Sequence, residues 1–293
     1  MRNVALNERI ALVTDSACDA SDAELAELGI ECVHLKVIMP DGSKFPEDNT
    51  DANKAVFYDF IADCDELPHT SMPSPADFGE LYSRLALEGY THVISMHIAS
   101  AQSGTCNAAR LASQSSSLEI AVIDTCCNTI GQLLFVRRIA QLRDKGYTFA
   151  QLVDTAHKLV GKTSVVFMLD TLRCLVKGGR TGRAVGLAAS LLNIKPMLTV
   201  EADGEVNMWG KVRSPKKAIP KLVEKARELT EAFGPIEACL VHVRDIADVT
   251  ALGHALEESG LPVTITGMMQ TGPVITTHVC VGCFGFAYVP MEV

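Results

Sequence analysis

Short apolar runs alternate with amphipathic stretches along the first half of the chain. The runs at residues 10–14, 91–98 and 118–125 end in polar residues, as buried strands do. The stretches between them carry apolar residues at helical spacing. This alternation predicts a parallel sheet with helices on both of its faces. Because ligands bind beyond the carboxyl ends of such strands, we expect Asp15 and Ser16 at the binding edge.

The same pattern predicts the individual elements of this half. Residues 30–39 are expected to form one strand, and Ser21 is expected to cap the first helix. Residues 68–78 are expected to form a loop, because their prolines exclude a helix before Ala76. Helices are expected at residues 21–28, 50–63, 76–89, 103–113, 128–146 and 148–161.

The second half has a different pattern. Residues 195–214 predict a hairpin that turns at Asp203-Gly204. Residues 215–234 predict an amphipathic helix that Pro220 either kinks or begins. Further strands are expected at residues 164–169, 236–243 and 263–267 and near the C-terminus, with helices at 184–193 and 247–259. These elements together predict a mixed α+β unit.

A chain of 293 residues exceeds what one hydrophobic core usually serves, so we expect two domains. Residues 1–161 are expected to form a three-layer α/β/α domain on a parallel sheet, and residues 162–293 an α+β domain on a mixed sheet. No apolar run is long enough to span a bilayer, and the first residues lack a hydrophobic signal core. We therefore expect a cytoplasmic protein without stable membrane insertion.

The charge distribution narrows the class of partner. A net charge of −9 argues against nucleic acid, since phosphate binding requires an excess of Lys and Arg. Residues 171–200 and 206–223, however, contain basic residues but no Asp or Glu. Such stretches indicate either a site for a small anion or an acidic partner, or only a solvated basic face.

Ten cysteines occur in the chain, and a cytosolic protein is expected to keep them as thiols. Cys32 and Cys239 lie in apolar contexts and are expected to be buried small hydrophobes. Cys280 and Cys283 have the spacing of a redox motif or of half a zinc site. Their segment is predicted to be a strand, which favours a structural role over either alternative.

Four polar points lie at or near predicted element ends. A helix N-terminus at "QSGTCNA" would favour a carboxylate or a phosphate. An arginine in "LVKGGRTGR" could contact either group through two hydrogen bonds, and the glycines would let the backbone approach a ligand. The candidate residues at these points are Thr70, Ser71, Ser103, Gly104, Arg180 and His278, the last following an expected apolar strand.

Each point has an ordinary alternative when taken alone. Ser103 can be a helix cap, Thr70 a turn residue and "KGGR" a basic turn. His278 can be a core or surface histidine whose hydrogen bonds are made within the fold. The chain contains neither the "GxSxG" nucleophile elbow nor the "GxxxxGK[ST]" phosphate loop. These absences argue against a hydrolase of that type and against ATP binding by that route.

Taken together, the motifs match one family. The stretches are "VTDSACD", "HTSMPSPADF", "ASAQSGTCNAA", "VIDT", "MLDTLRCLVKGGRTGR", "LNIKPML" and "TGPVITTH". With these motifs in this order, the chain resembles the DegV family of bacterial fatty-acid-binding proteins across nearly its full length. The resemblance implies two α/β domains with a lipid between them. It also implies the lipid-binding subunit of a fatty acid kinase, which presents the fatty acid to a separate kinase protein and has no catalytic activity or cofactor of its own.

The resemblance also implies roles for individual residues. Thr70 and Ser103 would hydrogen-bond the carboxylate, the Gly104 N–H would add a donor, and Arg180 and His278 would complete the head-group site. Ser71 would lie in the same loop, and Asp15 and Ser16 nearby as support. Phe167, Met168, Met268 and Met269 are candidates for the wall of the lipid tunnel or for ordinary core.

The chain departs from the family pattern at three points. Cys106 follows "SGT" where an aromatic residue is usual, and Gln102 changes the usual "LSG". "TTHVCVG" stands where "GxHxGPG" is usual around the histidine. Two other functions remain as alternatives: an acyl hydrolase that uses Ser103 or His278, and a thiol-redox or metal protein.

Overall fold

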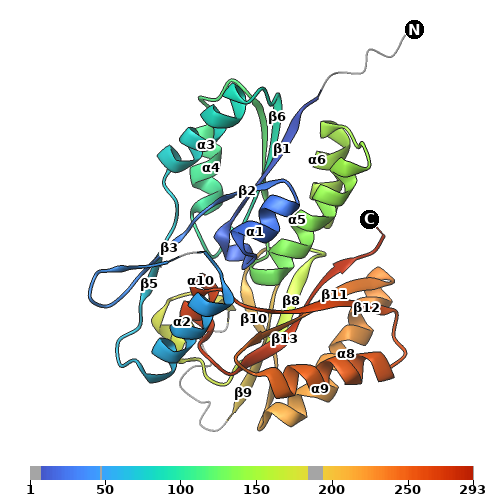
Figure 1. The fold of residues 1–293 in the computed structure, drawn as a ribbon. Helices are drawn as coiled ribbons and strands as arrows, with labels where there is room; N and C mark the ends of the chain where they lie inside the picture. Colours follow the sequence, from blue (N-terminus) through green and yellow to red (C-terminus); the bar gives the residue numbers. More distant parts are fainter. Residues whose placement is uncertain (1–7, 47, 184–193, 293) are drawn as a thin grey trace.

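The computed structural model describes residues 8–46, 48–183 and 194–292. In the first half, four parallel strands form a sheet in the order β2-β1-β6-β7. They are β1 (Ile10–Asp15), β2 (Ile30–Val33), β6 (His92–His97) and β7 (Glu119–Asp124). Helices cover both faces of this sheet (Figure 1). The central strands β1 and β6 are buried on both sides, as their uninterrupted apolar runs predict, whereas the edge strands β2 and β7 are partly exposed.

Alternate residues of β1 supply two separate cores. Ala11 and Val13 pack with α3 (Pro75–Leu87) and α4 (Thr105–Ser113). Leu12 belongs to the larger core on the other face, which includes α5 (Thr129–Asp144) and α6 (Phe149–Leu159). The 3-10 turn η1 (Ser16–Cys18) and α1 (Asp22–Glu27) connect β1 to β2.

The second half forms a six-stranded mixed sheet in the order β10-β9-β8-β13-β11-β12. Only the β11–β12 pair is parallel among its described pairs. α8 (Pro215–Phe233) and α9 (Ile246–Glu258) pack on one face, and α5 contacts β8 and β13 as well as β1. The strands are β8 (Ser164–Met168), β9 (Lys195–Val200), β10 (Val206–Val212), β11 (Ile236–Val243), β12 (Val263–Gln270) and β13 (Cys283–Pro290). One helix therefore packs on strands of both sheets (Figure 1).

A small third sheet and three helices lie beside the junction of the two halves. Its strands, in the order β4-β3-β5, are β3 (Lys36–Ile38), β4 (Lys44–Phe45) and β5 (His69–Ser71). α10 (Pro273–Val279) contacts β3 and β5, and also α2 (Asp51–Asp63) and α7 (Arg173–Lys177). A helix close to the C-terminus is thereby packed onto elements of the first half.

The predicted fold class is confirmed, with a parallel first sheet and a mixed second sheet. The predicted hairpin forms between β9 and β10, and Pro220 lies inside α8 rather than at its start. The predicted domain boundary at Gly161 stays a prediction, and it falls between the last strand of one sheet and the first of the other. The predicted helix at 184–193 lies outside the described residues.

Three local predictions were wrong. Residues 30–39 form two strands in different sheets, because the chain turns after Val33 and leaves the parallel sheet. Residues 68–78 contain β5, whose Thr70 pairs with Val37, and α3 begins at Pro75, where a proline needs no backbone partner. The apolar segment before His278 is α10 rather than a strand, again with a proline in its first turn.

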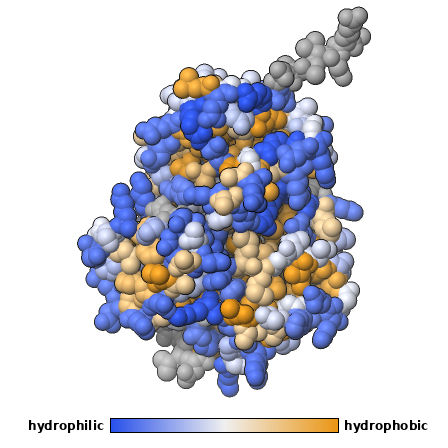
Figure 2. All heavy atoms as spheres, viewed as in Figure 1, coloured by the Kyte–Doolittle hydropathy of each residue, from blue (hydrophilic) through white to orange (hydrophobic). Residues whose placement is uncertain are grey.

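The face of the molecule drawn in Figure 2 is largely hydrophilic, with separate apolar patches over both halves of the molecule. None of the helices in residues 8–46, 48–183 and 194–292 combines the length and the apolar character that a membrane span requires.

Asp19 gives the fold a predicted pH dependence. Its side chain is fully buried, and burial raises its pKa to about 7, although Thr129 donates a 2.6 Å hydrogen bond to it. A carboxyl whose pKa is higher in the folded state stabilises the fold at low pH and loses that contribution as pH rises from about 4 to about 7. Buried histidines with a lowered pKa give the opposite slope, so the effect of Asp19 is measured as a difference between variants. Relative to Asp19→Asn, we expect the parent to lose free energy of unfolding, measured with urea, between pH 4 and pH 8. Asp63→Asn, at an exposed site, should follow the parent at every pH.

Candidate functional site

A cavity of about 310 Å³ lies between the two halves of the chain. One part of its wall is apolar and comes from both halves: Leu35, Met72, Ile98, Phe167, Leu175, Val206, Val274, Ile275 and Val279. The polar part of the wall is Thr70, Ser71, Gln102, Ser103, Gly104, Asn128, Arg180 and His278. The structure thus brings the candidates from all four polar points of the sequence to one cavity.

The loop between β6 and α4 places the N-terminus of α4 at this cavity. Gly104 is the N-cap of α4 and offers no side-chain cap. Ser103 Oγ lies 2.8 Å from Thr105 Oγ1, and it also accepts a long hydrogen bond from the Thr105 N–H. Met72 covers this turn, because a Cβ atom on Gly104 would lie 2.4 Å from its sulfur. The positive end of the α4 dipole therefore lies at the cavity wall, next to the Ser103 hydroxyl.

His278 and Thr70 meet across the cavity wall from α10 and β5. His278 Nε2 lies 3.0 Å from Thr70 Oγ1. Burial, together with the positive charge of Arg180, lowers the His278 pKa to about 4. The imidazole is therefore neutral at neutral pH and acts through hydrogen bonds rather than through charge.

A glycine of "KGGR" fits closely against this histidine. A Cβ atom on Gly178 would lie 2.4 Å from His278 Nδ1 and 3.0 Å from a backbone oxygen of α7. The sequence predicted that these glycines let the backbone approach a ligand. At Gly178 the close neighbour is instead the ring of His278, so the glycine serves the placement of that ring.

Arg180 is exposed and leaves part of its guanidinium available to a ligand. Its Nη1 donates to the Gly178 carbonyl at 2.7 Å, and its Nε approaches the Gln102 carbonyl at 3.5 Å. Gln102 is itself fixed, because it donates to the Gly204 carbonyl and accepts from Asn128. The sequence singled out Gln102 only as a departure and missed Asn128, which no motif of the chain marks.

Asp15 and Ser16 lie outside the lining but hold two residues that belong to it. The fully buried Asp15 carboxylate accepts the Ile98 N–H at 2.9 Å, and the Ser16 hydroxyl accepts the Leu35 N–H at 2.9 Å. Ile98 and Leu35 both line the cavity. The two side chains therefore position cavity wall and do not themselves face the cavity.

Of the four candidates for the tunnel wall, only Phe167 lines this cavity among the described residues. Met168 points to the opposite face of its strand and belongs to the core under α8 and α9. Met268 is partly exposed on β12, and Met269 packs against the large core. Strand alternation explains the difference between Phe167 and Met168, because neighbours on a strand face opposite sides.

Asp15 also belongs to a buried chain of polar side chains that sequence reasoning missed. Asp15 Oδ2 lies 3.0 Å from His97 Nδ1, and His97 Nε2 lies 2.6 Å from Ser95 Oγ. Tyr82 completes the chain at 2.8 Å from Ser95, and burial raises the Tyr82 pKa to about 12. The order of groups resembles a hydrolase triad, but Ser95 and His97 are wholly inaccessible to solvent. No substrate can reach Ser95, so this hydrogen-bonded series of side chains has a structural role.

The hydrolase alternative also lacks a nucleophile and base pair at the cavity. Ser103 is hydrogen-bonded to Thr105, and His278 to Thr70, so no hydrogen bond within the described residues joins Ser103 to His278. An activated serine requires such a contact with its base. The cavity therefore has the groups to bind an anion but not this arrangement for attacking an ester.

A disulfide between Cys174 and Cys280 corrects the expectation that all cysteines are thiols. It ties α7 to the end of α10, and both helices contribute residues to the cavity. Cys280 has a φ of 60°, a region that favours glycine, and the family pattern "GxHxGPG" has a glycine there. Because Cys280 is paired with Cys174, it is unavailable for a redox or zinc pair with Cys283.

Comparison with known proteins identifies the family. The model described as "Uncharacterised protein, DegV family" matches residues 9–291. A DegV domain-containing protein of Deinococcus radiodurans is 36% identical over 284 residues, which cover 97% of this chain and 99% of that one. Two solved structures, a DegV family protein from Thermus thermophilus and one from Streptococcus agalactiae, are both described as binding fatty acid. They are 33% and 29% identical, each with a TM-score of 0.88 over 97% of this chain and 100% of theirs. This chain therefore belongs to the DegV family.

Proposed function

We propose that this protein binds a long-chain fatty acid in the cavity between its two halves, with the carboxylate at the polar end. The observation that carries the proposal is the convergence of Thr70, Ser103, Gly104 and Arg180 on a cavity that apolar side chains from both halves of the chain also line. Each buried methylene contributes about 0.8 kcal/mol, and a dozen of them offset the several kcal/mol that desolvating a carboxylate costs.

The hydrogen bond between His278 and Thr70 supports a role for Thr70 as a donor. When Nε2 of the neutral imidazole carries the proton, it donates to Thr70 Oγ1. The Thr70 hydroxyl proton is then available to the carboxylate. His278 acts as a positioning residue in this arrangement, and Arg180 supplies the positive charge.

Removing one hydroxyl from the cavity tests the binding proposal. We expect Thr70→Val and Ser103→Ala each to weaken binding of a long-chain fatty acid by about tenfold or more, because hydrogen bonds to a charged group contribute about 1.5–3 kcal/mol. Native mass spectrometry of the purified protein, followed by titration of the delipidated protein, measures both occupancy and affinity. Ser83→Ala on the exposed surface of α3 is the matched control and should bind as the parent does. Binding that is unchanged in both cavity variants would contradict the proposed site.

We also propose that the protein presents its fatty acid to a partner kinase, which forms the acyl phosphate, and has no catalytic activity of its own. The resemblance motivates this step, and a separate basic surface offers a place for it. Lys216 and Lys217 are exposed at the start of α8 and lie outside the cavity lining. Exposed charges of this kind steer association more than they set the final affinity.

Charge reversal at these lysines tests the partner proposal. The double variant Lys216→Glu, Lys217→Glu should slow acyl-phosphate formation with the fatty acid kinase catalytic protein by roughly tenfold at low salt. Its fatty acid affinity should stay at the parent value, since neither lysine lines the cavity. Kinase-dependent turnover equal to that of the parent would exclude this surface as the docking site. Ester hydrolysis by the protein alone, abolished by Ser103→Ala, would instead favour the hydrolase alternative.

A further inference from the structure

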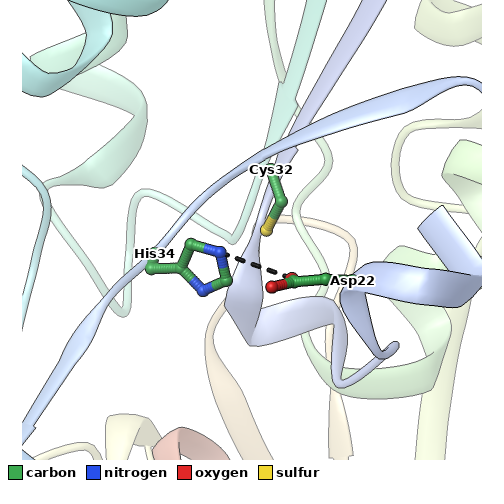
Figure 3. A group of neighbouring side chains, drawn as sticks. All are labelled: Asp22, Cys32 and His34. Carbon is green, nitrogen blue, oxygen red and sulfur yellow. Dashed lines mark ion pairs between the residues drawn. The ribbon is translucent and has the colours of Figure 1, made fainter. Parts of the chain in front are cut away.

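Three side chains with metal-binding atoms meet on the parallel sheet, outside the fatty acid cavity. They are Asp22, Cys32 and His34, and one donor atom from each lies within 4.8 Å of the other two. Figure 3 shows the carboxylate, the thiol and the imidazole turned toward one another. His34 Nε2 lies 3.3 Å from Asp22 Oδ1.

The local chain path accounts for the gathering. Asp22 is the first residue of α1, directly after the Ser21 cap. Cys32 lies on β2, and His34 follows two residues later at its end, so both side chains extend from the same side of the extended chain. The short connection from α1 to β2 then holds the carboxylate beside them. The three donors therefore come from a stretch of thirteen residues that two packed elements fix in place.

The surroundings of the cluster leave room for a ligand. A surface hollow of about 400 Å³ is lined by Asp22, Cys32 and His34 together with neighbouring residues of α1 and β2. The Nδ1 atom of His34 is buried and has no hydrogen-bond partner within the described residues. The imidazole is thus oriented by its neighbours and by Asp22 rather than by a hydrogen bond at its other nitrogen.

We propose that Asp22, Cys32 and His34 form a binding site for Zn²⁺. Thiolate, imidazole and carboxylate are the donors that zinc prefers, at about 2.0–2.3 Å from the metal. Donors at those distances in a tetrahedron are about 3.3–3.8 Å apart, so small side-chain movements within the observed 4.8 Å limit complete the geometry. Sulfur and nitrogen donors argue against Mg²⁺ and Ca²⁺, which take oxygen ligands. The fourth position is left to water.

The chemistry of this site predicts how zinc binding responds to conditions. Coordination requires the thiolate of Cys32 and a neutral His34, so zinc binding releases protons and weakens as pH falls. Because His34 directly precedes Leu35, which lines the fatty acid cavity, the two sites are neighbours along the chain. The zinc site does not depend on fatty acid binding, and its test uses no lipid.

Metal titration of the full chain, with its disulfide intact, tests the proposal. We expect one equivalent of Zn²⁺ to bind in calorimetry in the presence of excess Mg²⁺. Co²⁺ in place of Zn²⁺ should give the intense absorption of a thiolate-bound, tetrahedral metal. Cys32→Ser should abolish the thiolate band, and His34→Gln should lower Zn²⁺ affinity at least tenfold.

Cys64→Ser is the matched control, because Cys64 is also a half-buried thiol but lies at the end of α2. This variant should keep the stoichiometry and the spectrum of the parent. Circular dichroism before titration checks that each variant is folded, and the partly exposed His34 makes His34→Gln the safer of the two site variants. Zinc binding that is identical in Cys32→Ser, His34→Gln and the parent would assign the metal to other thiols. That result, or no binding by the parent, would overturn the proposal.

Discussion

Asp15→Ala is expected to lower the free energy of unfolding by about 3–5 kcal/mol. The carboxylate is inaccessible to solvent and accepts from three groups: the Ala17 N–H, the Ile98 N–H and the His97 ring. Alanine leaves all three without their partner, and each buried unsatisfied polar group costs about 1–3 kcal/mol. The effect should extend to the ligand, because the Ile98 backbone that Asp15 holds is part of the cavity wall.

Urea unfolding monitored by circular dichroism measures this loss. The matched control is Asp154→Ala, which removes an exposed carboxylate whose ion pair with Lys158 contributes at most about 1 kcal/mol. A loss below about 1 kcal/mol for Asp15→Ala would mean that water or a rearranged backbone satisfies the three donors. Fatty acid affinity, measured on the folded fraction of the same variant, should also fall if the position of Ile98 matters for the cavity.

Most helices and strands could be predicted from the sequence, because local patterns of residues determine them. Strand runs such as residues 118–125 and the Ser21 cap each act through neighbours in the chain. The mixed sheet was accessible because its hairpin turns at Asp203-Gly204, where Gly204 adopts a positive φ. One prediction failed where the chain leaves a sheet without a proline or a glycine to mark the exit, as it does after Val33.

The residues of the candidate site could be predicted from motifs, but the contacts among them could not. Thr70 and His278 are 208 residues apart, and no local pattern indicates that they share a hydrogen bond. The same holds for the buried hydrogen bonds that link Asp15 to His97 and His97 to Ser95, because Asp15 and His97 lie 82 residues apart in sequence. Contacts of this kind depend on how separate elements pack, and a single sequence does not record that packing.

The Cys174–Cys280 disulfide shows how such a contact changes the meaning of a sequence feature. Cys280 alone was a departure from the glycine of the family pattern, in a segment where a thiol was expected. Paired with Cys174, it becomes a link between α7 and α10, the two helices that carry Leu175 and His278 to the cavity. Its positive φ shows that the backbone has kept the conformation that glycine would adopt.

Reduction of this disulfide is expected to lower the free energy of unfolding by about 2–4 kcal/mol. The two cysteines are 106 residues apart, so the bond closes a long loop and removes much conformational freedom from the unfolded chain. Release of α7 from α10 should also weaken fatty acid binding, because both helices form cavity wall. Thermal unfolding and fatty acid titration, each with and without a phosphine reductant, measure the two effects.

Two variants distinguish the effect of the disulfide on stability from the effect of the backbone conformation at residue 280. Cys280→Ser and Cys280→Gly both lose the disulfide, and neither should respond to reductant. Cys280→Gly should be the more stable of the two, by up to about 1 kcal/mol, because glycine adopts the positive φ at residue 280 without strain. Titration of the denatured parent should find eight thiols before reduction and ten after it. Ten thiols before reduction, or a parent whose unfolding ignores the reductant, would show that α7 and α10 are held together by packing alone.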